Sequence, residues 1–187
     1  MPQLWKVSHS QIVGHHRIFR VREDTVIRPW DQQPQNFVVL ECPDWVNVIP
    51  INSKKEVLFV RQFRHGIKAV TLEIPGGMLD PEDTSPEVAA TRELLEETGA
   101  IGTEWISLGS CSPNPAFQDN RCHHFLAMGT AITHNIAPDS NEQFTLEWIP
   151  LEKINDYITA GKIIHSLVIA AFFALERWQI KKGISLS

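Results

Sequence analysis

Cysteine is scarce in this chain of 187 residues, which contains three, at positions 42, 111 and 122. Three cysteines are too few and too scattered for a disulfide framework or a CxxC metal site, so we expect reduced thiols in a reducing cytosol. Long apolar runs are also missing, because the longest, 167–175, is about half the length that a membrane span needs. Residues 1–6 lack the positive flank and apolar run of a secretory signal. The sequence therefore predicts a soluble cytoplasmic protein that has no membrane partner.

Positive charge is in short supply, with 17 Lys and Arg against 22 Asp and Glu and a formal net charge of −5. Proteins that bind long nucleic acid need clustered Lys and Arg to neutralise phosphates, so we exclude this class. The negative net charge still allows binding of a small anionic substrate, provided that a few cationic side chains or metal ions lie together at the binding site. With 43% hydrophobic residues, the chain is long enough for one main domain with a buried core and an appended segment.

The first 40 residues have the alternating pattern of short β-strands. Extended structure is predicted between residues 6 and 28, before the turn-rich segment 29–34. So short a set of strands does not make a domain alone. We therefore divide the chain into an N-terminal β-appendage, 1–40, and a main domain, 41–187.

The main domain mixes strands and helices without a regular βαβ alternation. Runs rich in β-branched and aromatic residues predict strands at 37–40, 46–51, 57–61, 105–110, 122–128 and 144–149. A first helix begins near residue 85, either with Ser85 as its cap or with a capping box of Thr84 and Glu87, and ends at Gly99. Two more helices are predicted at 151–159 and 164–178. This order favours the α+β class, an α/β/α sandwich with a mixed sheet.

The helix between residues 85 and 99 carries the chemistry. At 100° per residue, Arg92, Glu93, Glu96 and Glu97 fall within an arc of roughly 140° on one face. Carboxylates at these spacings repel each other, and a cation would relieve the repulsion. Oxygen-rich sites favour Mg²⁺ or Mn²⁺, which keep positions open for water and phosphate. The alternative is a solvated helix face in which Arg92 pairs with one of the glutamates.

Residues 77–100 resemble the Nudix box, Gly-x5-Glu-x7-Arg-Glu-U-x-Glu-Glu-x-Gly-U, where U is aliphatic. The second half of the pattern, 92–100, matches closely, although Ala100 is small for its position. The first half differs, because Asp83 stands where the pattern has Glu, and eight residues separate it from Arg92 instead of seven. The departure lies in the loop and leaves the metal-binding helix intact, so neither Asp83 nor Glu82 is assigned as a residue of the box.

The resemblance implies a Nudix fold and assigns a role to each residue of the acidic face. Glu93 and Glu97 would be the main metal ligands, Glu96 an additional carboxylate with a catalytic part, and the carbonyl of Gly76 a further ligand. Arg92 would orient a glutamate through a charge-assisted hydrogen bond. The cofactor would be Mg²⁺, or Mn²⁺ in its place. The metals would neutralise a diphosphate, activate a water and stabilise the leaving oxygen.

Segments 60–64 and 72–77 are similar to the ADP-ribose and nucleotide-sugar diphosphatase branch of this family. The resemblance places Arg61, Arg64 and Glu73 at the substrate cleft, and an arginine fork suits a diphosphate. The alternative is that Arg64 is an ordinary exposed arginine.

The loop 112–117 is similar to a Ser-Pro-Gly loop that marks the ADP-ribose group. Pro115 is the candidate substrate contact, or an ordinary turn residue, while Ala116 and Asn120 depart from the usual residues of that loop. Members of the family often take a general base from an acidic loop before the last strand, where Glu142 lies here. A solvated loop carboxylate is the alternative for Glu142.

Aromatic residues and histidines outside these motifs receive separate interpretations. Trp45 and Trp30 are candidates for stacking on a base, although core packing is the commoner role of such a side chain as Trp45. His123 and His124 are neighbours in a predicted strand and face opposite sides, so they do not share a metal, and we interpret them as structural.

Together these features predict metal-dependent hydrolysis of the diphosphate of a nucleotide sugar, ADP-ribose or a relative, to a nucleoside monophosphate and a sugar phosphate. The alternatives are a Nudix hydrolase of nucleoside triphosphates or dinucleoside polyphosphates, and a Nudix-fold sensor that binds a nucleotide without cutting it. We also predict a homodimer in which the N-terminal 40 residues form part of the interface.

Overall fold

The computed structural model describes residues 3–137 and 143–186 of the chain. These residues form two compact units. The first contains Met1–Asp44 and Ser112–Arg121, and the second contains Trp45–Cys111 and Cys122–Ser187. The first unit is therefore longer than the predicted appendage, because it ends at Asp44 and takes in a loop that is distant in sequence.

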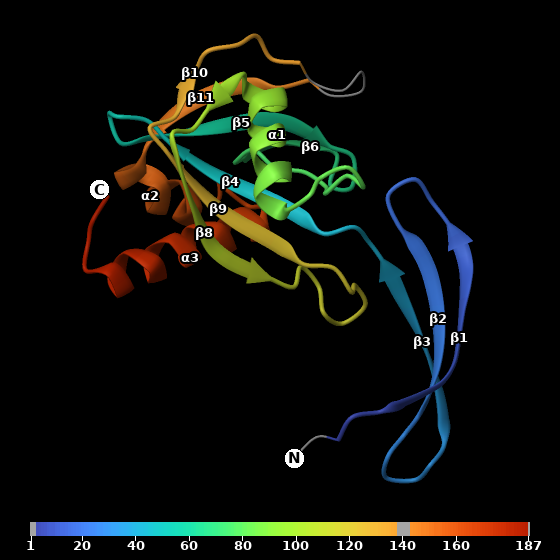
Figure 1. The fold of residues 1–187 in the computed structure, drawn as a ribbon. Helices are drawn as coiled ribbons and strands as arrows, with labels where there is room; N and C mark the ends of the chain where they lie inside the picture. Colours follow the sequence, from blue (N-terminus) through green and yellow to red (C-terminus); the bar gives the residue numbers. More distant parts are fainter. Residues whose placement is uncertain (1–2, 138–142, 187) are drawn as a thin grey trace. The chain divides into compact units, whose positions relative to one another are not determined.

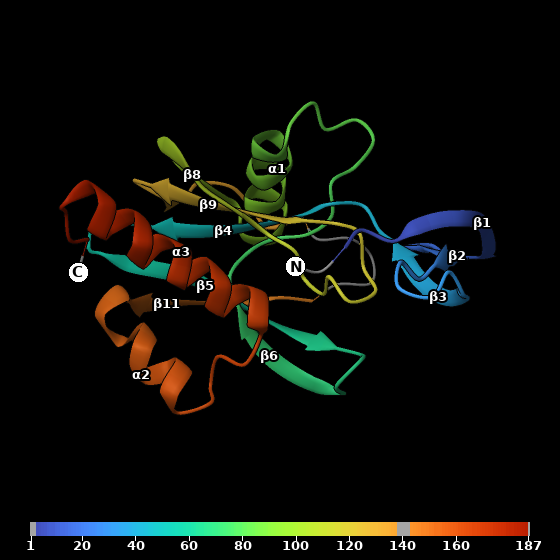
Figure 2. The ribbon, with the colours of Figure 1, turned by 90° about the horizontal axis from the view of Figure 1, so that it is seen from below.

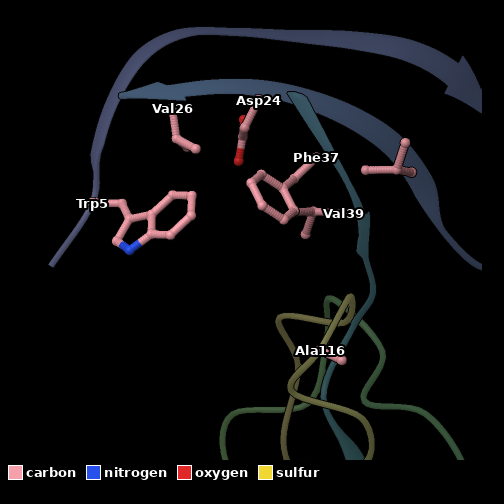
Figure 3. Close-up of a pocket in the computed structure, with 7 residues that line it drawn as sticks. Trp5, Asp24, Val26, Phe37, Val39 and Ala116 are labelled. Atoms are coloured by element: carbon pink, nitrogen blue, oxygen red, sulfur yellow. The ribbon is translucent and has the colours of Figure 1, made fainter. Parts of the chain in front are cut away.

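The first unit is a three-stranded antiparallel sheet with strand order β1-β2-β3 (Figure 1). Its strands are β1 (Lys6–His15), β2 (Arg20–Ile27) and β3 (Pro34–Glu41). The loop 112–121 is tied to the end of β3, since the N–H of Leu40 donates to the carbonyl of Phe117 at 2.7 Å. A cavity on the face of this sheet is lined by Trp5, Asp24, Val26, Phe37, Val38, Val39 and Ala116 (Figure 3).

Strand β2 carries an ion-pair network beside this cavity. The guanidinium of Arg22 donates to Asp24 at 3.0 Å and to Glu41 on β3 at 2.5 Å. These hydrogen bonds lower the pKa of both carboxyl groups. Asp24 is therefore charged at neutral pH although its side chain is buried.

The second unit is a six-stranded mixed sheet in the order β11-β5-β4-β9-β8, with β6 paired to β5. Its strands are β4 (Trp45–Ile51), β5 (Glu56–Arg64), β6 (Ala69–Glu73), β8 (Glu104–Cys111), β9 (Cys122–Met128) and β11 (Thr145–Pro150). A separate short pair joins β7 (Ala100–Ile101) and β10 (Ala131–Ile132). The helices are α1 (Pro86–Thr98), the 3-10 turn η1 (Leu151–Lys153), α2 (Ile154–Thr159) and α3 (Ser166–Lys182). Strands β4 and β9 are parallel and the other pairs antiparallel, which confirms the predicted mixed sheet.

Helices cover both faces of this sheet, α1 on one side and α2 with α3 on the other (Figure 2). On the α1 side, Ala90 and Leu94 pack against Val48. On the other side, Phe172 of α3 stacks on Phe59 of β5 with ring centroids 5.9 Å apart. Successive strand residues face opposite sides, so each central strand supplies both cores. The predicted α/β/α sandwich is confirmed.

Local sequence signals set the ends of α1. The hydroxyl of Ser85 accepts a hydrogen bond from the N–H of Val88 at 3.2 Å, so Ser85 is the cap and the alternative box of Thr84 and Glu87 is not formed. Gly99 ends the helix with a φ of 65°, in the left-handed region that glycine adopts without strain. No helix in residues 3–137 or 143–186 has the length and apolarity of a membrane span.

The segment 75–77 fills a gap between β4 and β5. These two strands pair only at Ile51 and Val57, and β5 then turns away to pair with β6. In the space beside β4, the carbonyls of Pro75 and Gly77 accept hydrogen bonds from the N–H groups of Val48 and Val46. The glycines are thereby held at the sheet, on the path that leads into α1.

Candidate active site

Arg92 is the centre of the polar network on α1. Its guanidinium donates to the carbonyl of Met78 at 3.0 Å and to Asp83 at 2.9 Å. It also donates to Glu93 and to Glu96, each at 3.0 Å. The hydrogen bond with Asp83 is the main cause that raises the pKa of Arg92 above its ordinary value. One arginine thus contacts two of the three glutamates.

Asp83 in the loop before α1 pairs with Arg92, and its neighbour Glu82 points to solvent. The side chain of Asp83 is 5% exposed and accepts two hydrogen bonds from Arg92, whereas Glu82 is exposed. The hydrogen bond from Arg92 also lowers the pKa of Asp83. The extra residue in the loop is therefore accommodated before α1, and the aspartate still reaches the arginine.

We expect Asp83→Ala to lower the free energy of unfolding by about 2–3 kcal/mol, because it leaves Arg92 without its least exposed partner. Turnover should fall as well, since Arg92 holds the glutamates. Urea unfolding of both Asp83→Ala and the neighbouring control Glu82→Ala measures this. Equal stability losses in the two variants would contradict the assignment.

Glu97 and Glu93 lie against the two glycines that precede the helix. The carboxylate of Glu97 accepts a hydrogen bond from the N–H of Gly76 at 3.1 Å. A Cβ added at Gly77 would collide with the carboxylate of Glu93. Glu97 is buried and the Glu93 side chain is 14% exposed, so the description of a solvated helix face does not fit these two residues.

The donor set of carboxylates on α1 fits a hard divalent cation. In the part of the chain that the structure describes, no group of three His, Cys, Asp or Glu side chains is arranged to hold a metal. Glu93 and Glu96 turn to Arg92, and Glu97 turns to Gly76. Oxygen ligands and a backbone that can approach closely are what Mg²⁺ and Mn²⁺ require.

A second polar network lies on β5 and β6. Arg64 donates to both carboxylate oxygens of Glu73, at 2.9 and 2.7 Å, and the hydroxyl of Thr71 donates to Glu73 at 2.5 Å. Burial alone would raise the pKa of Glu73, but the hydrogen bonds and charge of Arg64 outweigh it and the pKa lies below its ordinary value. Glu73 is therefore an ionised carboxylate that holds the arginine fork in place.

His165, which the sequence did not suggest, joins this network from the start of α3. Its Nδ1 accepts a hydrogen bond from the N–H of Leu167 at 3.2 Å, so the ring hydrogen is on Nε2. That Nε2 lies 3.8 Å from the Glu73 carboxylate. No spacing in the sequence indicates this contact, because ninety-two positions separate the two residues.

The two predicted cleft arginines lie on opposite faces of the sheet. Arg61 pairs across the strands with Leu72, which belongs to the core of α2 and α3. Arg64 instead donates hydrogen bonds to Glu73. Glu73 is the register partner of Val60, and Val60 and Arg64 point to the same side of β5 because they are four residues apart. Arg61 donates to Glu147 of β11 at 2.7 Å, an ion pair that the sequence did not suggest. Strand alternation thus points Arg61 and Arg64 to opposite sides of β5, and the network of Arg64 extends to His165 at the start of α3.

Of the remaining candidates, Trp45 lies beside the Arg92 network, because it forms a bridge with Met78. Pro115 is exposed, in a turn that closes through the N–H of Gln118 and the carbonyl of Asn114 at 2.8 Å, within the first unit. Trp45 is half-buried at the start of β4. Trp30 is 64% exposed in the first unit, with its ring 5.0 Å from that of Trp5. Glu142 belongs to 138–142, outside the residues that the structure describes.

Comparison with known proteins agrees with this geometry. A model of the NUDIX domain matches residues 43–171. An ADP-ribose pyrophosphatase of Mycobacterium tuberculosis is 28% identical over 168 residues, which cover 89% of this chain and 81% of that protein. The methanol dehydrogenase activator of Bacillus methanolicus is 31% identical over 91% of this chain and 92% of its own. An ADP-ribose pyrophosphatase of Bacillus subtilis is 33% identical over 78% and 77% of the two chains.

The fold is also found among solved structures. The crystal structure of an ADP compounds hydrolase superposes with a TM-score of 0.85 at 20% identity, over 98% of both chains. The NUDIX match covers more than half of this chain and includes α1 with its glutamates and the glycines before it. This chain therefore belongs to the NUDIX family.

Proposed function

We propose that this protein hydrolyses the diphosphate of a nucleoside diphosphate sugar, ADP-ribose or a related nucleotide sugar, to a nucleoside monophosphate and a sugar phosphate. The observation that carries the proposal is the acidic face of α1. On this face Glu97 and Glu93 lie against Gly76 and Gly77, and Arg92 donates hydrogen bonds to Glu93 and Glu96. Relatives named ADP-ribose pyrophosphatase, matched over most of their length, support the substrate class.

In the proposed site, Glu93 and Glu97 hold a divalent cation, Mg²⁺ or Mn²⁺, with Glu96 as a further carboxylate. Gly76 directs its N–H towards Glu97, and a residue in extended conformation points its carbonyl to the same side, which supports that carbonyl as a ligand. When bound, the cation would neutralise the diphosphate, make a water more acidic and stabilise the leaving oxygen. Arg92 keeps the glutamates oriented, and Glu142 is proposed as the base that takes the proton from the attacking water.

The proposed substrate contacts are Arg64 and Glu73, together with Trp45 and Pro115, and Arg61 on the opposite side of β5 is the second candidate arginine, to be tested against Arg64. The Arg64 fork is already oriented by Glu73, and its side chain is 43% exposed, so it is accessible to a diphosphate. Trp45 would stack on a base through its exposed part. The turn at Pro115 would contact the substrate through the exposed end of its loop.

We expect Arg64→Lys to raise KM for ADP-ribose about tenfold, because lysine keeps the charge but loses the two-pronged geometry. The matched control is Arg61→Lys on the opposite face, where we expect a change below about threefold. Steady-state kinetics with both variants distinguishes the two arginines. A larger effect at Arg61 would assign the cleft to the other face of the sheet.

The proposal includes a homodimer in which the first unit forms part of the interface and of the substrate pocket. Strand β1 is exposed over almost its whole length, and Val7, Val13 and Val38 are each about half exposed. A three-stranded sheet with so much uncovered apolar surface gains stability from a partner. The cavity that Trp5, Phe37 and the charged Asp24 line supports a ligand contact in this unit (Figure 3).

A cytoplasmic location also belongs to the proposal, since none of the three cysteines forms a disulfide in the structure.

Light scattering tests the dimer. We expect the full chain to have the mass of two copies at micromolar concentration, and a chain that starts near Phe37 to lose that association, because it lacks β1 and β2. A monomeric full chain would count against the dimer. A shortened chain that stays dimeric and fully active would show that the first two strands have another role.

A substrate panel tests the reaction. The full chain with Mg²⁺ should cleave ADP-ribose or another nucleotide sugar faster than nucleoside triphosphates or dinucleoside polyphosphates. Preference for the triphosphates or polyphosphates would favour the other hydrolase class. Binding of a nucleotide without turnover of any compound would favour a sensor.

A further inference from the structure

Two of the three cysteines, eleven positions apart in the sequence, meet in the sheet. Cys111 ends β8, Cys122 begins β9, and the two residues are register partners in this antiparallel pair. Opposite residues of antiparallel strands have Cα atoms roughly 4.5–5.5 Å apart. A disulfide needs a separation of about 4.4–6.8 Å. The backbone therefore already has a spacing that a disulfide can bridge.

His124 shows that both sulfur atoms lie on one face of the sheet. Its Nε2 is 3.3 Å from the sulfur of Cys111, and its Nδ1 is 4.0 Å from the sulfur of Cys122. Burial, with a smaller contribution from His123, lowers the pKa of His124 to about 4. The ring is therefore neutral at neutral pH, and its unprotonated nitrogen can accept a hydrogen bond from a thiol.

We propose that Cys111 and Cys122 are a site of reversible oxidation that forms an intramolecular disulfide when the protein meets a peroxide. Cys111 is half-buried and Cys122 is fully buried, so the peroxide reaches Cys111 first. The sulfur of Cys111 attacks one peroxide oxygen, the O–O bond breaks, and with hydrogen peroxide a water leaves and a sulfenic acid remains. The sulfur of Cys122 then displaces a second water. Two thiols and one hydrogen peroxide thus give one disulfide and two waters.

The disulfide would close the loop 112–121 at its base. This loop carries the turn at Pro115, and it is fixed to the first unit where the N–H of Cys42 donates to Asp119 at 3.1 Å and that of Arg121 donates to Asp44 at 2.8 Å. Its two ends are the points at which the chain leaves and re-enters the second unit. Oxidation would therefore link the two ends of the loop covalently, and it would lower the conformational entropy of the unfolded chain.

Cys42 provides the matched control. After treatment of the full-length protein with hydrogen peroxide and denaturation without reductant, titratable thiols should fall from the three of the sequence to one. In Cys42→Ser they should fall from two to none, while Cys111→Ser and Cys122→Ser should form no intramolecular bridge. Intact mass should decrease by two hydrogen atoms, and peptide mapping of the natural protein should join residues 111 and 122 even if a variant fails to fold.

The oxidised protein should also have a higher Tm, by several degrees, and dithiothreitol should reverse the change. An unchanged thiol count, a bridge that includes Cys42, or a mass increased by oxygen instead of lowered by hydrogen would overturn the proposal. A bridge that leaves Tm unchanged would overturn its effect on the loop. These readouts do not involve turnover, so they are independent of the proposed hydrolysis.

Discussion

Glu97→Gln is expected to lower kcat by about 10³-fold or more while the fold stays nearly intact. Loss of one anionic ligand forfeits several kcal/mol of charge stabilisation in the transition state. The fold should survive because glutamine keeps an oxygen that can accept the hydrogen bond from the N–H of Gly76. Removal of one negative charge also relieves repulsion on α1. Glu93→Gln should behave in a similar way.

Kinetics at saturating ADP-ribose and ordinary Mg²⁺, together with thermal melting, measure this effect. Glu87→Gln is the matched control, because Glu87 is an exposed glutamate in the first turn of the same helix. Its activity should equal that of the natural protein. Near-normal turnover in Glu97→Gln would eliminate the proposed metal site, and a large drop in Tm would mean that Glu97 is mainly structural.

Glu142→Gln should lower kcat by about 10²-fold with little change in metal affinity, as expected when a positioned general base is lost. Glu142 is chosen as the base because it belongs to an acidic segment of the sequence that precedes β11, the last strand of the sheet. A cation that makes the attacking water more acidic reduces how strong this base must be, so the effect is expected to be smaller than that of Glu97.

The nearby variant Asp139→Asn removes a charge from the same loop and serves as the control. It should leave kcat within about threefold of the natural value. Metal titrations of activity separate the two effects, because a ligand variant changes the Mg²⁺ requirement and a base variant does not. A change below about threefold in Glu142→Gln would show that the base lies elsewhere or that water alone serves.

Local signals in the sequence predicted the framework of the site well. Ser85 caps the start of α1, Pro86 occupies its first turn, and Gly99 ends the helix in a left-handed conformation. Each of these signals acts within one turn of the helix, so it can be recognised in the local sequence. The same logic could have placed the end of α3, which extends to Lys182 and is capped by Gly183, four residues beyond the predicted end at 178. Strand β6 was not predicted, because its five residues contain no clear alternation.

Contacts between distant segments could not be predicted in this way. The pairing of Asp83 with Arg92 depends on how the loop before α1 folds back. The pairing of Arg64 with Glu73 depends on the register of β5 with β6. The meeting of Cys111 and Cys122 depends on the pairing of β8 with β9, although the sequence alone shows the two thiols as scattered. Register is set by core packing over the whole sheet, which a local pattern does not contain.

The most direct measurement is the release of AMP from ADP-ribose by the full-length protein, followed by chromatography, with Mg²⁺ and again with the metal chelated. We predict AMP and ribose 5-phosphate in equal amounts with Mg²⁺ and none above background after chelation, with activity restored when Mg²⁺ is added back. Equal rates with and without the chelator, or intact ADP-ribose and intact related nucleotide sugars after long incubation with Mg²⁺, would contradict the account.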